Sequence, residues 1–123
     1  MIAVDSSSLR RYFDGRRGSD VSLLVRAADD DSLILPPVVV AETLSDPGLP
    51  PLFAAMIQSF RMLELRAGYW VRTGELRAAT LQYGYKAKLA DVLIAQSCID
   101  HDVPLITYDA DFRHFTRAGL KLA

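Results

Sequence analysis

The chain has 123 residues and half of them are apolar, which is enough for one packed domain and far too apolar for a disordered chain. Fourteen Lys and Arg face fifteen Asp and Glu, and this net charge of −1 argues against a protein that coats DNA non-specifically. The one cysteine, Cys98, excludes an intramolecular disulfide framework and a cysteine-based zinc cluster. No apolar run reaches the roughly 18 residues that cross a bilayer. We therefore expect a cytoplasmic protein without a membrane partner.

The first element is a short apolar run, Ile2–Val4, which predicts a buried strand that stops at Asp5. Three serines follow, and then Leu9, Tyr12 and Phe13 at helical spacing predict a helix capped by a serine. Short apolar runs and segments of helical periodicity alternate along the rest of the chain. The further predicted strands are 33–35, 62–65, 105–107 and a possible fifth at 120–122, and the further predicted helices are 19–28, 38–44, 52–60, 69–83 and 88–100.

This alternation predicts an α/β fold, a sandwich with a short, mainly parallel five-stranded sheet in one domain over residues 1–123. Parallel strands are buried on both faces and read as continuous apolar runs, as these do. In open α/β sheets, ligands bind outside the carboxyl ends of the strands. The residues that follow each strand are therefore the first place to look for chemistry.

Acidic residues stand at two strand ends and in two apolar helices. Asp5 follows the first strand and Asp109 the fourth, with Asp111 two residues on. Glu42 and Asp91 interrupt apolar helical segments, where a carboxylate is rarely found unless it is paired, hydrogen-bonded or bound to metal. Each has an ordinary alternative: a helix cap for Asp5, a solvent-facing position for Glu42, a helix-dipole effect for Asp91, and a turn for Asp109 and Asp111.

Converging carboxylates would need a cation. At about 5 Å and an effective dielectric near 20, each like-charged pair costs roughly 3 kcal/mol. Oxygen ligands without His or Cys suit Mg²⁺ or Mn²⁺, which activate water and steady a phosphate in transfer. The reaction class that follows is metal-assisted hydrolysis of a phosphodiester.

Five segments in order carry a resemblance to a known family. Ile2–Ser7 is similar to the opening strand with its Asp and Ser, Val40–Glu42 to the segment with the glutamate, and Leu89–Ala95 to the start of the helix with the third acid. Pro104–Phe112 and Gly119–Leu122 are similar to the closing segments. Together they resemble the PIN-domain ribonucleases, specifically the VapC-type toxins of type II toxin–antitoxin systems. After Glu42 the chain departs from the family's usual Leu-x-x-Gly.

The resemblance implies a PIN-like α/β/α sandwich and a magnesium-dependent endoribonuclease that uses Mg²⁺ or Mn²⁺. It also implies a cognate antitoxin that blocks the site, a homodimer, and an RNA substrate whose class (tRNA, rRNA or mRNA) stays open. The site residues that it implies are Asp5, Glu42, Asp91 and Asp109 for catalysis, Asp5, Asp91, Asp109 and Asp111 for the metal, and Ser7, Ser6 and Thr107 for positioning substrate or water.

Other interpretations remain open. A PIN-like RNA-binding or regulatory module without nuclease activity would keep the fold, but it would be marked by the loss of one acid, and none is lost. A receiver-like domain would need an early acidic pair and a late lysine, and a haloacid-type phosphatase would need Asp where Ser7 stands. The arginines 10, 11, 16 and 17 either hold RNA phosphates or form a solvated face. Leu9, Tyr12, Phe13 and Phe53 are the expected antitoxin groove.

Overall fold

The computed structural model describes residues 1–123 and contains one parallel sheet of four strands. The strands are β1 (Ile2–Val4), β2 (Leu33–Leu35), β3 (Arg61–Met62) and β4 (Leu105–Ile106), in the order β3-β2-β1-β4. Ala3 of β1 pairs with Ile34 on one side and with Leu105 on the other. The α/β class and the parallel sheet are confirmed, and β1 and β4 are neighbours.

The sheet has four strands, so the prediction of five is wrong. At 120–122 only a single bridge, Leu105 to Leu122, pairs with β4, because only one residue of each segment meets a partner. The third strand also differs from its predicted range, 62–65, since Leu63 still donates to Leu35 but Glu64 and Leu65 already lie in solvent.

Six α-helices occur where helices were predicted. Asp5, not a serine, caps the first of them, because its carboxylate accepts the backbone N–H of Ser8 at 3.2 Å. Prolines stand in the first turns of two others, where their missing N–H is not needed. The helices are α1 (Ser6–Phe13), α2 (Ser19–Asp29), α3 (Pro37–Leu44), α4 (Pro51–Ser59), α5 (Tyr69–Gln82) and α6 (Leu89–His101).

A 3₁₀-helix, η1 (Ala110–Ala118), follows β4 in a segment for which the sequence predicted no helix or strand. Phe112 and Phe115 are both buried, and their spacing of three residues is the period of a 3₁₀-helix. Asp109 caps this helix through Asp111, whose N–H lies 2.9 Å from its carboxylate. The helix therefore begins directly at the predicted site.

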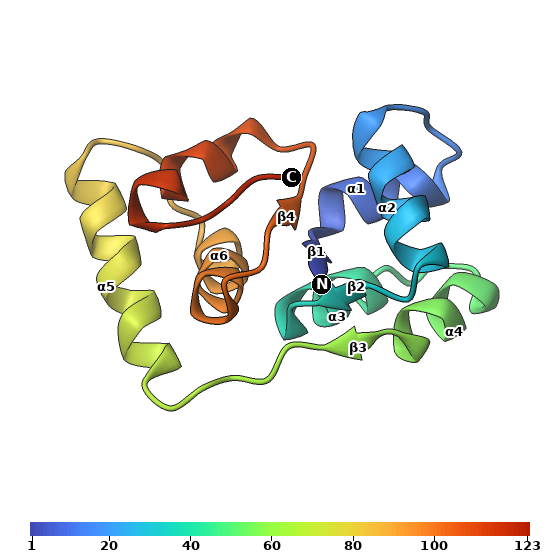
Figure 1. The fold of residues 1–123 in the computed structure, drawn as a ribbon, viewed down its shortest axis with the longest axis horizontal. Coiled ribbons are helices and arrows are strands. Elements are labelled where there is room, and N and C mark those ends of the chain that lie inside the picture. The colour runs from blue at the N-terminus through green and yellow to red at the C-terminus, as the bar shows by residue number, and fades with distance from the viewer.

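Helices cover both faces of the sheet. Neighbouring residues of a strand point to opposite faces, and both Ala3 and Val4 of β1 are buried, as are Leu105 and Ile106 of β4. Figure 1 shows α5, α6 and the red C-terminal helix on one side of the strands and α1, α2 and α4 on the other. No helix is both long and apolar enough to span a membrane.

Candidate active site

Asp5 is the buried centre of the site. Its side chain is 2% exposed, and it accepts hydrogen bonds from Thr107 Oγ1 at 2.6 Å and Ser7 Oγ at 2.8 Å, besides the Ser8 N–H. Burial raises the pKa of Asp5 above its usual range, although these hydrogen bonds oppose the rise. The backbone has thus placed a desolvated, rigidly held carboxylate at the carboxyl end of β1.

The loop after β4 is tied to the same carboxylate. Thr107 Oγ1 accepts the backbone N–H of Asp109 at 3.0 Å, and Ser7 Oγ accepts that of Tyr108 at 3.1 Å. Because each hydroxyl also donates to Asp5, the two serve as bridges between β1 and the segment that carries Asp109. The predicted strand 105–107 ends one residue early, at Ile106. The next residue, Thr107, is held by its side-chain hydrogen bonds to Asp5 and Asp109.

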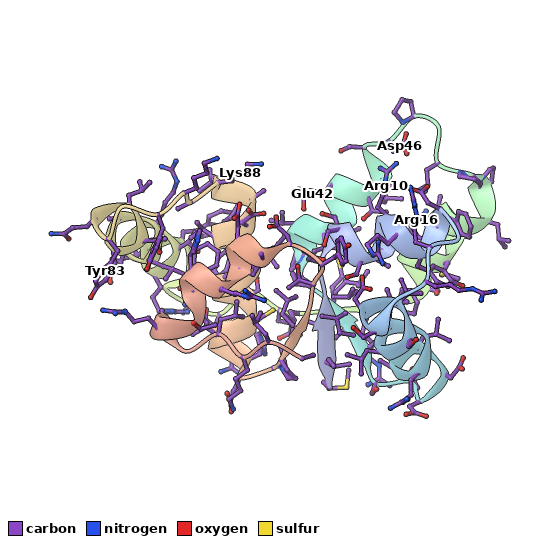
Figure 2. The ribbon with its side chains drawn as sticks, turned by 90° about the horizontal axis from the view of Figure 1, so that it is seen from above. Arg10, Arg16, Glu42, Asp46, Tyr83 and Lys88 are labelled. Carbon is purple, nitrogen blue, oxygen red and sulfur yellow. The ribbon has the colours of Figure 1, made fainter.

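Glu42 lies on the solvent side of α3, as its alternative interpretation held, and it is nevertheless connected to the site. Ser6 Oγ, on the first turn of α1, donates to Glu42 Oε1 at 3.2 Å. Ser6 and Glu42 also line one pocket of about 330 Å³, together with Ser7, Arg10 and Phe13. In Figure 2, Glu42 lies near the middle of the molecule, and Arg10 and Asp46, which form an ion pair at 2.9 Å, lie to its right.

The pKa of Asp91 reflects the charges of the other three predicted catalytic acids. This pKa is raised to about 6, first by burial and then by the charges of Asp109 and Glu42, against the opposing charge of Lys88 and with a smaller contribution from Asp5. No hydrogen bond to the chain stabilises its ionised form. The acids of β1, α3, α6 and the β4–η1 loop therefore form one electrostatic cluster, whereas Asp111 joins it only through its backbone N–H.

The donor set of this cluster fits a hard divalent cation, because every side chain offers carboxylate oxygen and none offers sulfur or imidazole. However, no three His, Cys, Asp or Glu side chains are arranged so that they could hold one ion. The cause is visible in the contacts: Asp5 is turned toward Thr107 and Ser7, and Asp109 toward the N–H of Asp111. Mutual repulsion favours such separate partners over a shared centre.

A polar network behind Asp5 was missed by the sequence analysis. Asp20, on α2, is 7% exposed and accepts from Ser8 Oγ at 2.8 Å and from Arg11 Nε at 3.1 Å. Burial opposes ionisation, but the hydrogen bonds from Ser8 and Arg11 hold the pKa of Asp20 below its usual range. The Arg11 guanidinium also lies 3.7 Å from the centre of the Tyr108 ring. In the sequence, Asp20 looks like any acid in the first turn of a helix, so no signal could have identified it.

The comparisons with known proteins agree with this architecture. A chain of VapBC2 from Rickettsia felis bound to a DNA fragment from its promoter superposes with a TM-score of 0.76 at 20% identity, covering 100% of this chain and 98% of the other. FitAB bound to an IR36 DNA fragment gives 0.74 at 17% identity, with 100% and 94% covered, and FitAcB from Neisseria gonorrhoeae gives 0.74 at 18%, with 99% and 96% covered. No curated protein sequence matches. The sequence model of the PIN domain matches residues 2–118, and this chain therefore belongs to the PIN domain family.

Proposed function

We propose that this protein is a metal-dependent endoribonuclease toxin, of the VapC type, that a cognate antitoxin holds inactive. The observation that carries the proposal is that four carboxylates lie close enough to interact: burial, and then the charges of Asp109 and Glu42, raise the pKa of Asp91 to about 6. Membership of the PIN family and the similarity of the fold to toxin–antitoxin complexes support it. Repulsion between carboxylates costs stability, and a bound divalent cation would remove that cost, so the arrangement favours a cation site.

Asp5, Asp91 and Asp109, with Asp111 beside them, would hold Mg²⁺ or Mn²⁺. When bound, the cation supplies charge neutralisation at the phosphate and a more acidic water. Asp5 needs no rearrangement of its backbone, since Thr107 and Ser7 already fix its position. Glu42, the most exposed of the four acids, faces the open pocket on the α3 side, where it can orient the attacking water or the ribose next to the scissile phosphate.

The antitoxin would cover the pocket beside Glu42. Phe13 and Phe53 stack there with ring centroids 4.3 Å apart, Tyr12 lies against both, and all three rings are half-buried. Leu9, which was expected to share this groove, is fully buried and belongs to the core instead. An antitoxin segment with one apolar face and an arginine or lysine would cover the rings and pair with the carboxylates at once.

A homodimer is part of the proposal. Trp70 and Val71, at the start of α5, are 67% and 65% exposed, so two adjacent apolar side chains face solvent together. A second copy packed on this face would bury them.

The test is cleavage of a fluorescently labelled single-stranded RNA by the purified protein, in millimolar Mg²⁺ or Mn²⁺ and in EDTA. We expect cleavage only with the metal, and Asp91→Asn to reduce the rate at least 100-fold while the circular dichroism spectrum stays unchanged. Asp30→Asn is the matched control, because Asp30 is an exposed acid at the end of α2. Parent-rate cleavage by Asp91→Asn would refute the assignment. Tight RNA binding without any cleavage would favour the non-catalytic RNA-binding module instead.

A further inference from the structure

A second pocket, of about 390 Å³, lies between α5 and η1, away from the pocket beside Glu42. Its wall includes Tyr83 and Tyr85, which follow α5, and Arg113, His114 and Arg117 of η1; we call it the tyrosine–histidine pocket. Figure 2 shows Tyr83 at the left end of the molecule and Glu42 near its middle. Arg10 and Arg16 lie to the right of Glu42. None of its five named residues is a predicted site residue.

The aromatic side chains of this pocket are already arranged for stacking. The Tyr85 and His114 rings are parallel within 8°, with centroids 4.4 Å apart, and the Arg117 guanidinium lies 4.2 Å from the centre of the Tyr83 ring. Tyr83 and Tyr85 are 57% and 49% exposed, although two tyrosines that served only packing would be more deeply buried. Flat, half-exposed π faces of this kind are what a nucleobase stacks on.

The charge of the pocket favours an anionic ligand. No acidic residue lines it, and neither Arg113 nor Arg117 takes part in any of the five ion pairs of the protein. Of the four arginines near the N-terminus, Arg10 pairs with Asp46 and Arg11 with Asp20, whereas Arg16 and Arg17 form no ion pair. On a protein with a net charge of −1, the unpaired cations of η1 are better partners for phosphates than Arg10 and Arg11 are.

Arg113 connects this pocket with the acid cluster. It also lines a neighbouring pocket of about 270 Å³, together with Thr107, Tyr108 and Asp109. His114 follows Asp109 by five residues along η1, which is about 10 Å at the rise of a 3₁₀-helix. The two pockets therefore form a path from the carboxylates to the stacked rings.

From this arrangement we infer that the tyrosine–histidine pocket binds a base of single-stranded RNA, one that lies a short distance along the strand from the scissile phosphate. The inference rests on the proposed ribonuclease function and names the feature of the substrate that the protein grips. Arg113 and Arg117 contact the phosphates that flank this base, and Tyr85 with His114 supplies the stacking surface. A duplex cannot use the pocket, because its bases are stacked on one another.

The experiment measures fluorescence anisotropy of a labelled 12-nucleotide RNA of mixed sequence in EDTA, where the chain is intact. We expect Tyr85→Ala to weaken binding about tenfold, which is the size of the loss of one stacked base, and Tyr85→Phe to restore it. Arg117→Ala should also decrease the slope of log K against log salt by about 0.7, the value for one phosphate contact on a single strand. Arg26→Ala, an exposed and unpaired arginine on α2, should change neither quantity.

The same variants are then assayed for cleavage with Mg²⁺, where we expect KM to rise and kcat to stay within about twofold. Unchanged RNA affinity of both Tyr85→Ala and Arg117→Ala, or no affinity of the parent protein for the RNA, would overturn the inference. The inference would also be overturned if these variants changed the mass of the protein in sedimentation and not its affinity for RNA. The pocket would then be a contact between two copies of the chain. Pocket-dependent binding without any cleavage would support the inference and refute the nuclease.

Discussion

The charge on Asp91 lowers the stability of the metal-free protein, and its removal should raise it. Asp91 is part-buried, accepts no hydrogen bond from the chain, and has a pKa raised from 3.8 to about 6 by burial and by the charges of Asp109 and Glu42. At 1.36 kcal/mol per pH unit this rise equals about 3 kcal/mol. Because the side chain is partly in solvent, screening reduces the cost to about 1–2 kcal/mol. Asp91→Asn keeps the shape and removes the charge.

The sign of the pH dependence follows from linkage. The folded pKa lies above the unfolded one, so the destabilisation is complete above about pH 6 and disappears as the pH falls toward 3.8. In EDTA at pH 7.5, Asp91→Asn should therefore melt about 3–10 °C higher than the parent, and the two should melt together near pH 4. Differential scanning calorimetry from pH 4 to 7.5 measures this, with Asp30→Asn as control. A variant that is less stable at pH 7.5, or a difference that does not depend on pH, would refute the cluster.

Three further predictions follow from the contacts. Asp5→Ala should lower the free energy of unfolding by about 2 kcal/mol in urea denaturation, because α1 loses its cap and the Thr107 and Ser7 hydroxyls lose their acceptor; equal stability would show that Asp5 does not anchor the site. Asp100→Asn should lower the melting temperature at pH 7, because Arg72 donates to both carboxylate oxygens of Asp100 and lowers the pKa of this acid. Since the ion pair is lost once Asp100 is protonated, the difference in melting temperature should shrink below pH 3.8. Millimolar Mg²⁺ should raise the melting temperature of the parent but not of Asp5→Asn/Asp91→Asn, because a bound ion adds about 2.7 kcal/mol to the free energy of unfolding at a hundred times its dissociation constant. An equal response in both proteins would place the ion elsewhere.

The part of the site that lies at strand ends could be predicted from the sequence. Asp5 and Thr107 each follow an uninterrupted apolar run, and parallel strands bring such positions to one edge of the sheet. Asp5 and Thr107 contact each other directly because β1 and β4 are neighbours in the sheet. This order of strands is not encoded in any local sequence pattern.

Other features depend on packing that no spacing reveals. The sequence left open whether the arginines at 10 and 11 contact RNA or face solvent, and the structure pairs them with acids from other segments, Asp46 and Asp20. The 3₁₀-helix η1 was not predicted, because a period of three over nine residues is too short to separate from chance. The prediction of a fifth strand was wrong for a similar reason. A short apolar run predicts extended backbone but not how many of its residues will pair with a neighbouring strand.

The contacts around Asp5 fix the positions of the segments that carry the acid cluster. Hydrogen bonds and one cation–π contact form a closed ring through α1, α2 and the β4–η1 loop, in which every buried side-chain nitrogen and oxygen has a hydrogen-bond partner. Because the ring closes, the position of the loop with Asp109 does not depend on the charge of Asp109 itself. The repulsion therefore acts mainly on Asp91 and Glu42, which have the fewest polar partners among the four acids. For the same reason these two side chains are the most free to turn toward an ion. The members of the ring are Asp5, Ser7, Ser8, Arg11, Asp20 and Tyr108.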